Sequence, residues 1–264
     1  MKILAELFRR QPTLATAAQI CLIAVLPCLL AMWVDARLIN GISVWIKPAK
    51  FFVSLALYYA TLAWFFGYLP QAAQASRGGH FVIRAALIAG LLEMAWLIAA
   101  AVVGVPSHFN RQSLVWGVLY PAAGIAATML LLAVLVQGVM ISRDRSVDLP
   151  PAFRRSLVLG AGLSFAVTLI TAAVLSSGTG HWVGGTPSDA AGLPLVGWSR
   201  SGGDLRAAHF FALHLHQALP LAGWAIVRGG WPRALAAVHL SAVLMVGWVG
   251  FTFVQALMGR AVMG

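Results

Sequence analysis

Charged side chains are scarce in this sequence: they make up 9% of its 264 residues, against 61% hydrophobic residues. A soluble domain carries roughly 25% charged residues, so the chain lacks the polar surface that a water-soluble protein needs. Acidic residues are the rarer sign, with 7 Asp and Glu against 18 Lys and Arg, and the net charge is +11. Because no long Lys/Arg run occurs, this charge fits loops beside anionic lipid headgroups and not a nucleic-acid groove.

Cysteine and the common catalytic motifs are also missing or rare. Only Cys21 and Cys28 occur, both in the first apolar run. Seven helical residues place them roughly 10 Å apart, beyond the ~7 Å Cα limit for a disulfide, so we expect buried packing. No GxSxG hydrolase motif, phosphate-binding loop or dinucleotide fingerprint is present, and no HExxH, HxxxH or CxxCH pattern either.

Long apolar runs are what the sequence has in abundance. Each is close to the about 20 residues with which a helix crosses roughly 30 Å of hydrocarbon. We predict an all-α integral membrane bundle of about seven transmembrane helices that forms a single domain, residues 1–264. The expected spans are 13–34, 42–69, 85–104, 114–140, 156–176, 207–227 and 234–257.

The distribution of basic residues predicts the orientation of this bundle. The N-terminus begins like a signal peptide, but its apolar core is too long and no cleavage site follows, so it is interpreted as an uncleaved first span. Placing it in the cytoplasm puts most of the Lys and Arg residues on that side, which predicts a C-terminus outside. Residues 177–203 then form one long, Gly-rich outer loop, either a lid or a mobile connection.

Polar residues gather at the outer ends of the predicted spans. The second span carries a one-sided stripe at i, i+4, i+8 and i+11, made of Lys50, Ser54, Tyr58 and Thr61. Such a stripe is costly against lipid, so it is expected to face the bundle interior or a water-filled cavity, unless the lysine merely reaches the headgroups. The candidate ligand-binding residues are Asp35, Lys47, Lys50, Tyr58, His108, Asn110, Arg111, Asp204, Arg206 and Gln217.

The sixth span opens with Asp204, Arg206 and His209. A carboxylate at position 204 is a candidate N-cap, because it can accept the free amides of a first helical turn. Arg206 beside a helix N-terminus is typical of an anion site. The alternative is a structural ion pair in which Asp204 neutralises Arg206 or Lys50, and the sequence favours neither interpretation.

Three ionisable residues are expected near mid-membrane: Glu93, His216 and His239. An ionisable residue at that depth is a functional hypothesis by default. The pair His216 and His239 from separate helices is compatible with haem b, and two histidines with a carboxylate are compatible with a divalent metal. Glu93 with a histidine is also compatible with a proton relay, and for any one histidine an interhelical hydrogen bond is the simpler role. The cofactor is otherwise unknown.

Four strings, WIKPAKFF, PSHFN, GWSRSGGDLR and HFFALH, resemble a group of uncharacterised bacterial multi-pass inner-membrane proteins. The likeness is spread over most of the chain. His209, His214 and Gln217 fit the pattern of that group, whereas the fit of His216 is open. The resemblance implies a multi-pass protein of the bacterial inner membrane and implies no activity.

Three functions are compatible with these observations. The one we favour is a haem- or metal-binding membrane oxidoreductase, or another membrane enzyme, whose outward-opening site uses Glu93, His209 and His214 as catalytic residues. The second is a transporter or channel for a small solute, with anions among the candidates. The third is an assembly or sensor subunit of a membrane complex. The expected partners are the lipid bilayer and a small-molecule ligand from the outer side.

Overall fold

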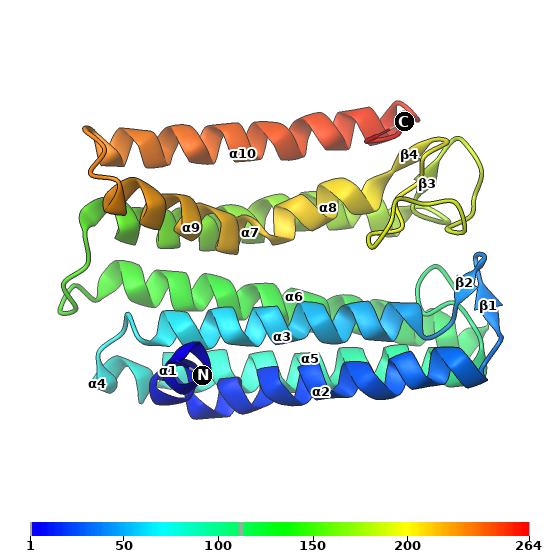
Figure 1. Ribbon diagram of the computed structural model, residues 1–264, viewed down its shortest axis with the longest axis horizontal. Coiled ribbons are helices and arrows are strands. Elements are labelled where there is room, and N and C mark those ends of the chain that lie inside the picture. The colour runs from blue at the N-terminus through cyan, green and yellow to red at the C-terminus, as the bar shows by residue number, and fades with distance from the viewer. Residues whose placement is uncertain (1, 111–112, 264) are drawn as a thin grey trace. The chain divides into compact units, whose positions relative to one another are not determined.

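The computed structural model describes residues 2–110 and 113–263, and nearly all of its regular structure is helical (Figure 1). Within these described residues, six helices are long and apolar enough to cross a membrane, and a bent pair of shorter helices makes up to seven. The prediction of an all-α multi-pass membrane bundle is therefore confirmed. The chain divides into two compact units, Met1–Met140 and Ile141–Gly264, and each is described by itself. Their joining into one domain stays a prediction.

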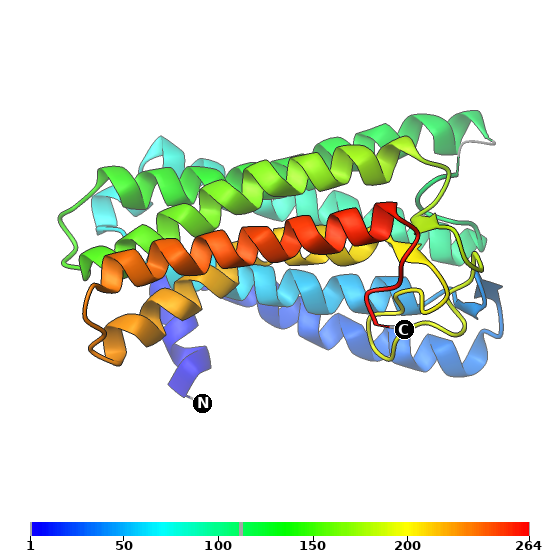
Figure 2. The same cartoon turned by 90° about the horizontal axis from the view of Figure 1, so that it is seen from above.

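The long helices within each unit run side by side in both views (Figures 1 and 2). Unit 1 contains α1 (Lys2–Arg10), α2 (Pro12–Val34), α3 (Ile46–Phe66), α4 (Gln71–Gln74), α5 (Arg77–Val103) and most of α6 (Leu114–Arg143). Unit 2 contains α7 (Pro151–Ser177), α8 (Leu205–Leu213), α9 (Leu215–Arg228) and α10 (Ala234–Leu257). Two short antiparallel pairs complete the structure: β1 (Leu38–Ile39) with β2 (Ile42–Ser43), and β3 (Trp182–Val183) with β4 (Gly203–Asp204).

Local sequence sets several helix ends. The Gln11 side chain accepts the backbone N–H groups of Thr13 and Leu14 at the start of α2. Ser76 caps α5 in the same way, and Gly104 ends that helix with a left-handed φ of 82°, a conformation that glycine adopts without strain. These caps satisfy backbone groups that the first and last helical turns leave open.

Three predicted spans differ clearly from the structure. The third was expected to begin at residue 85, but α5 begins at Arg77. The second was expected to begin at residue 42, but residues 38–43 form the β1–β2 hairpin and α3 begins at Ile46. Asn40 and Gly41 close the hairpin with φ values of 53° and 83°, as a tight two-residue turn requires. The sixth, expected as one helix over 207–227, is broken at His214 into α8 and α9, which are bent by 50°.

Large apolar side chains cover the outside of the long helices. On α2, Ile20, Leu22 and Leu30 are exposed, and on α10, Val243 and Leu244 are exposed. A water-soluble protein rarely exposes so large a continuous apolar surface, whereas hydrocarbon solvates it. The exposed faces of these helices are therefore lipid-facing.

In unit 1, α3 packs closely against α5 and α6. Tyr59 donates to the backbone oxygen of Ala86 on α5 at 3.1 Å. A Cβ on Gly90 would lie 1.9 Å from the Tyr59 hydroxyl, so only glycine fits there. On the side of α6, Gln137 is buried and its Nε2 donates to the backbone oxygen of Leu62 at 3.0 Å.

In unit 2, small residues on α7 let α9 approach. A Cβ on Gly160 would lie 3.0 Å from the Leu215 carbonyl oxygen and 3.1 Å from Cδ of Pro220. A Cβ on Gly223 of α9 would lie 2.1 Å from Oγ and 2.4 Å from Cβ of Ser156. Close packing of this kind, with glycine and serine at the contact, is how membrane helices associate without a hydrophobic driving force.

We expect Gly223→Ala to destabilise unit 2, because its methyl group overlaps Ser156. Overpacking costs about 1–3 kcal/mol, and the better helix propensity of alanine recovers up to about 1 kcal/mol of that. Gly162→Ala on α7 is the matched control, since nothing lies within 4 Å of the added Cβ. Thermal unfolding in detergent should show a lower midpoint for Gly223→Ala alone; equal midpoints would contradict the close α7–α9 contact.

Candidate functional site

A hydrogen-bonded group lies at the β1–β2 end of unit 1. Lys47 Nζ donates to Ser107 Oγ at 2.7 Å and lies 3.0 Å from His108 Nδ1. Because an ammonium group can only donate, His108 Nδ1 is the acceptor, and its ring proton is on Nε2. The His108 ring also contacts Tyr120 edge-on, with centroids 5.5 Å apart. Lys47 and His108 are thus brought together as a candidate binding pair.

Glu93 lies inside unit 1, on α5, with 4% of its surface exposed. Within residues 2–110 and 113–263, no group hydrogen-bonds its carboxyl. Lys47 interacts with it electrostatically, although the two form no ion pair within 4.0 Å. A buried carboxyl without a hydrogen bond is energetically costly, so this residue is a candidate for a functional role.

Asp35 has a structural role beside the β1–β2 hairpin. It accepts hydrogen bonds from Arg37 Nε at 2.9 Å and Nη2 at 2.7 Å, and from Trp45 Nε1 at 2.8 Å. Arg37 also donates to the backbone oxygen of Val102 at the end of α5. The hydrogen bonds from Arg37, and then that from Trp45, hold the pKa of Asp35 well below its ordinary value. This predicted ligand residue is therefore a structural partner of Arg37.

The polar stripe of α3 does not line one common cavity. Tyr58 faces α6 and donates to the backbone oxygen of Leu130 at 2.8 Å. Thr61 donates back to Leu57 in its own helix, and Ser54 is exposed. Lys50 is half-buried near the hairpin end of the helix.

Two predicted ligand residues follow α5. Asn110 is half-buried in the connection between α5 and α6. Arg111 lies outside the described residues.

An ion-pair network closes the loop end of unit 2. Asp204 is fully buried and accepts from Arg206 Nε at 2.9 Å and Nη2 at 2.7 Å. It also caps α8 by accepting the backbone N–H of Arg206 at 3.0 Å. Both predicted roles, N-cap and structural pair, are therefore present in one side chain.

Two residues that the sequence analysis did not single out complete this network. Asp189 accepts from Arg206 Nη2 at 2.7 Å and from His181 Nε2 at 3.3 Å. Burial acts to raise the pKa of Asp189, but the hydrogen bonds and charges of His181 and Arg206 outweigh it, and the pKa lies below its ordinary value. The Trp198 ring packs on Phe210 and Phe211. Residues 178–204 are thus a folded segment held onto α8.

A polar seam follows α7 where it meets α8 and α9. We use the name α7 seam for Gly160, Ser164, Thr168 and Thr171 with the facing His209 and His216. Thr171 Oγ1 lies 3.3 Å from His209 Nδ1. The buried Thr168 hydroxyl has no hydrogen-bond partner in the part of the chain that the structure describes. The i+4 and i+3 spacing of these α7 residues is a signal that sequence analysis overlooked.

The break between α8 and α9 lies beside this seam. The Leu213 carbonyl accepts from Ser164 Oγ at 2.8 Å and from His216 Nδ1 at 2.6 Å. The Phe210 carbonyl accepts from His214 Nδ1 at 2.7 Å. A carbonyl oxygen only accepts, so Nδ1 of His214 and Nδ1 of His216 each carry a proton.

His239 lies apart from the seam residues just described, whereas Gln217 directly follows His216. His239 Nε2 accepts from Arg155 Nε at 3.1 Å, beside the start of α10. Five residues from Ala234 place it about 8 Å into the helix, whereas His216, twelve residues before Arg228, is about 18 Å from the same end. The two histidines are therefore not at one depth. Gln217 is half-buried in the first turn of α9.

The described residues contain no group of three or more His, Cys, Asp or Glu side chains placed to hold a metal ion. The polar groups that are assembled are hydrogen-bonding networks of imidazole, hydroxyl, carboxylate and guanidinium groups. Such groups can bind an anion or a small polar solute, or pass a proton.

Comparison of the chain with protein-family models, with curated proteins and with solved structures gives no match.

We expect acid to loosen the 178–204 segment. Because the pKa of Asp189 is lowered from the ordinary value of 3.8, its contribution to stability is present above that pH and is lost as the pH falls through the lower folded value. Hydrogen exchange of this segment, measured from pH 5 downward and corrected for the intrinsic amide rate at each pH, should show protection that falls below about pH 4. Asp189→Asn should exchange fast throughout, while Asp148→Asn, outside the segment, should behave as wild type.

Proposed function

We propose that this protein is a membrane transport protein that moves protons across the bilayer through unit 2. The observation that carries the proposal is the break of the α8–α9 span at His214, beside the α7 seam. Discontinuous membrane helices are typical of transporters, where irregular backbone at membrane depth lines a binding site. We favour transport over an enzyme because His214 and His216 lie at a helix break, and the described residues bring no third His, Cys, Asp or Glu together with them as a metal site would.

The break supports transport because a backbone carbonyl there has two side-chain donors. The Leu213 carbonyl has two partners, Ser164 Oγ and His216 Nδ1. Either partner can leave while the other still satisfies the carbonyl, so His216 can change its hydrogen bond without leaving a buried carbonyl unpaired. A group with that freedom can take up a proton and pass it on.

The α7 seam supplies groups that can carry the proton. His209 lies beside Thr171, and Thr168 lies about one turn from Ser164 and about one turn from Thr171 on the same face of α7. Hydroxyl and imidazole groups both donate and accept, so a row of them is suited to proton transfer. The seam begins close to the Asp204–Arg206 network and reaches His216 at the middle of the span.

We expect the reconstituted protein to carry protons when a potential is applied. Liposomes loaded with a pH-sensitive dye and given a potassium diffusion potential should change internal pH faster with protein than without it. His216→Gln should bring the rate near that of protein-free liposomes, because glutamine keeps a donor but cannot titrate. His80→Gln, an exposed histidine at the start of α5 in unit 1, should leave the rate unchanged.

Equal rates for wild type, His216→Gln and empty liposomes, at both polarities of the potential, would exclude the proposal. A rate lowered equally by His216→Gln and His80→Gln would also count against it, since the second residue lies outside unit 2.

A second candidate function is the haem- or metal-binding oxidoreductase. The observation that favours it is the proton position of His214 and His216: in both, Nδ1–H donates to a backbone carbonyl. Metal-ligating histidines are usually oriented by such a bond, which leaves Nε2 for the metal. Against it, His239 is bonded to Arg155 and lies about 10 Å from the depth of His216.

Absorption spectroscopy and metal analysis of the purified protein separate the two candidates. Because the proposed proton path needs only side chains of the chain, we expect no Soret band and less than one metal ion per chain. A Soret band that is lost in His216→Gln but kept in His80→Gln would instead support the oxidoreductase.

The orientation and the host membrane belong to the same proposal. The charge distribution supports an N-terminus inside and a C-terminus outside. The likeness to bacterial inner-membrane proteins supports that membrane as the location. With this orientation the 178–204 segment and the Arg206 network face the outside.

A further inference from the structure

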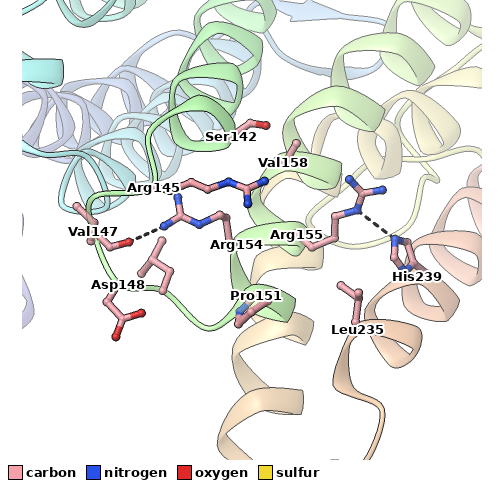
Figure 3. Close-up of a pocket in the computed structure, with 11 residues that line it drawn as sticks. Ser142, Arg145, Val147, Asp148, Pro151, Arg154, Arg155, Val158, Leu235 and His239 are labelled. Atoms are coloured by element: carbon pink, nitrogen blue, oxygen red, sulfur yellow. Dashed lines mark hydrogen bonds between the residues drawn. The ribbon is translucent and has the colours of Figure 1, made fainter.

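The end of unit 2 away from the 178–204 segment contains an open pocket of about 430 Å³. It lies between the α6–α7 connection, the first turns of α7 and the start of α10, as Figure 3 shows. Three arginines line it: Arg145, Arg154 and Arg155. The pocket is separate from the α7 seam, and the inference drawn from it does not depend on the proposed function.

Arg154 has a structural role. Its guanidinium donates to the backbone oxygens of Ile141 and Asp144 at 2.7 Å each and of Val147 at 2.5 Å. These bonds collect carbonyl groups from the end of α6 and from the following connection. Arg154 therefore holds the wall of the pocket and has little left to offer a ligand.

Arg145 and Arg155 donate to no backbone carbonyl among the described residues. The Arg145 side chain has no hydrogen-bond or ion-pair partner in residues 2–110 and 113–263. Arg155 donates only through Nε, to the neutral acceptor His239 Nε2, within the same described ranges. Both residues line the pocket, and Figure 3 shows the Arg155 guanidinium on the side of His239 and the Arg145 guanidinium on the side of the α6–α7 connection. Two positive charges thus border one pocket.

The neighbouring carboxylates do not neutralise them. Asp144 bonds the backbone N–H of Ser146 at 2.9 Å and its hydroxyl at 2.6 Å. The Asp148 carboxylate points away from both guanidinium groups (Figure 3). The pocket therefore has the charge of an anion site, and planar guanidinium groups are suited to bidentate contacts with phosphate oxygens.

An apolar pocket of about 280 Å³ adjoins the basic one. The two share Pro151 and Leu235, and the second is lined further by Ile226, Val227 and Trp231. Trp231 is exposed in the turn between α9 and α10, a position typical of tryptophan at a membrane interface. A ligand that fills both pockets must carry an anionic head and an apolar tail.

We propose that these adjoining pockets bind an anionic phospholipid, with its phosphate between Arg145 and Arg155 and an acyl chain along Ile226 and Trp231. Free phosphate matches the basic pocket but leaves the apolar one unused. Basic pockets between membrane helices are a recurring way to hold anionic headgroups. The site lies on the side that the positive-inside rule assigns to the cytoplasm.

The test measures binding of a fluorescent phosphatidylglycerol to the full-length protein in a neutral detergent, with competition by unlabelled compounds. Unlabelled phosphatidylglycerol should displace it, whereas phosphatidylcholine and inorganic phosphate should compete at least about tenfold more weakly. Arg145→Gln/Arg155→Gln should lower the affinity about tenfold or more, since each arginine is worth about 1 kcal/mol or more beside an anionic headgroup. Arg145→Lys/Arg155→Lys, which keeps both charges, should retain part of the affinity and shows the loss to be local if the first variant folds poorly.

The matched control is Arg77→Gln/Arg84→Gln, which removes two exposed charges from α5 in unit 1, on the same predicted side. It should change the affinity less than twofold. Equal weakening by both Gln variants would overturn the proposal in favour of general charge attraction. Equally strong competition by inorganic phosphate would overturn the assignment of a lipid, and equally strong competition by phosphatidylcholine would overturn recognition of negative charge.

Discussion

Backbone carbonyls that cannot reach water must find donors inside the protein, and the break at Leu213 shows what this constraint demands. The carbonyl is kept satisfied by Ser164 from α7 and by His216 from the next turn. Ser164 reaches it only if α7 lies close, and α7 lies close only because Gly160 and Gly223 leave room for the opposing helix. The packing of unit 2 and its candidate proton path are therefore linked through one peptide carbonyl, which side chains satisfy at the helix break.

The same constraint also gives three of the arginines a structural role. At three helix ends an arginine donates to terminal carbonyls: Arg10 to Trp64 of α3, Arg37 to Ala101 and Val102 of α5, and Arg154 to Ile141 of α6. A cation at a helix C-terminus also interacts favourably with the helix dipole. These arginines thus stabilise the fold, which a net charge read from composition does not distinguish from charge available to a partner.

The sequence predicted the long helices well, because each contains a continuous apolar run that needs no tertiary information. It did not predict the break at His214, because no glycine or proline occurs at that position. The proline of this span, Pro220, lies inside α9, where its ring packs over Gly160. The sequence also did not predict the roles of Asp35 and His239, because folding determines their partners. Those partners are Arg37 and Trp45 for Asp35, and Arg155 for His239. Spacing alone indicated the N-cap at Asp204, and it would have indicated the α7 seam had Ser164, Thr168 and Thr171 been compared by helical face.

Arginine in a membrane protein marks a ligand site only where its charge is not already matched. At the loop end of unit 2, Arg206 lies between Asp189 and Asp204, so an added anion there would compete with two carboxylates. At the other end, Arg145 and Arg155 line one open pocket, and the Asp148 carboxylate is turned away from both. The sequence motif around Arg206 suggested an anion site, but the pairing of charges supports the proposal of an anion site at the α6–α7 connection instead.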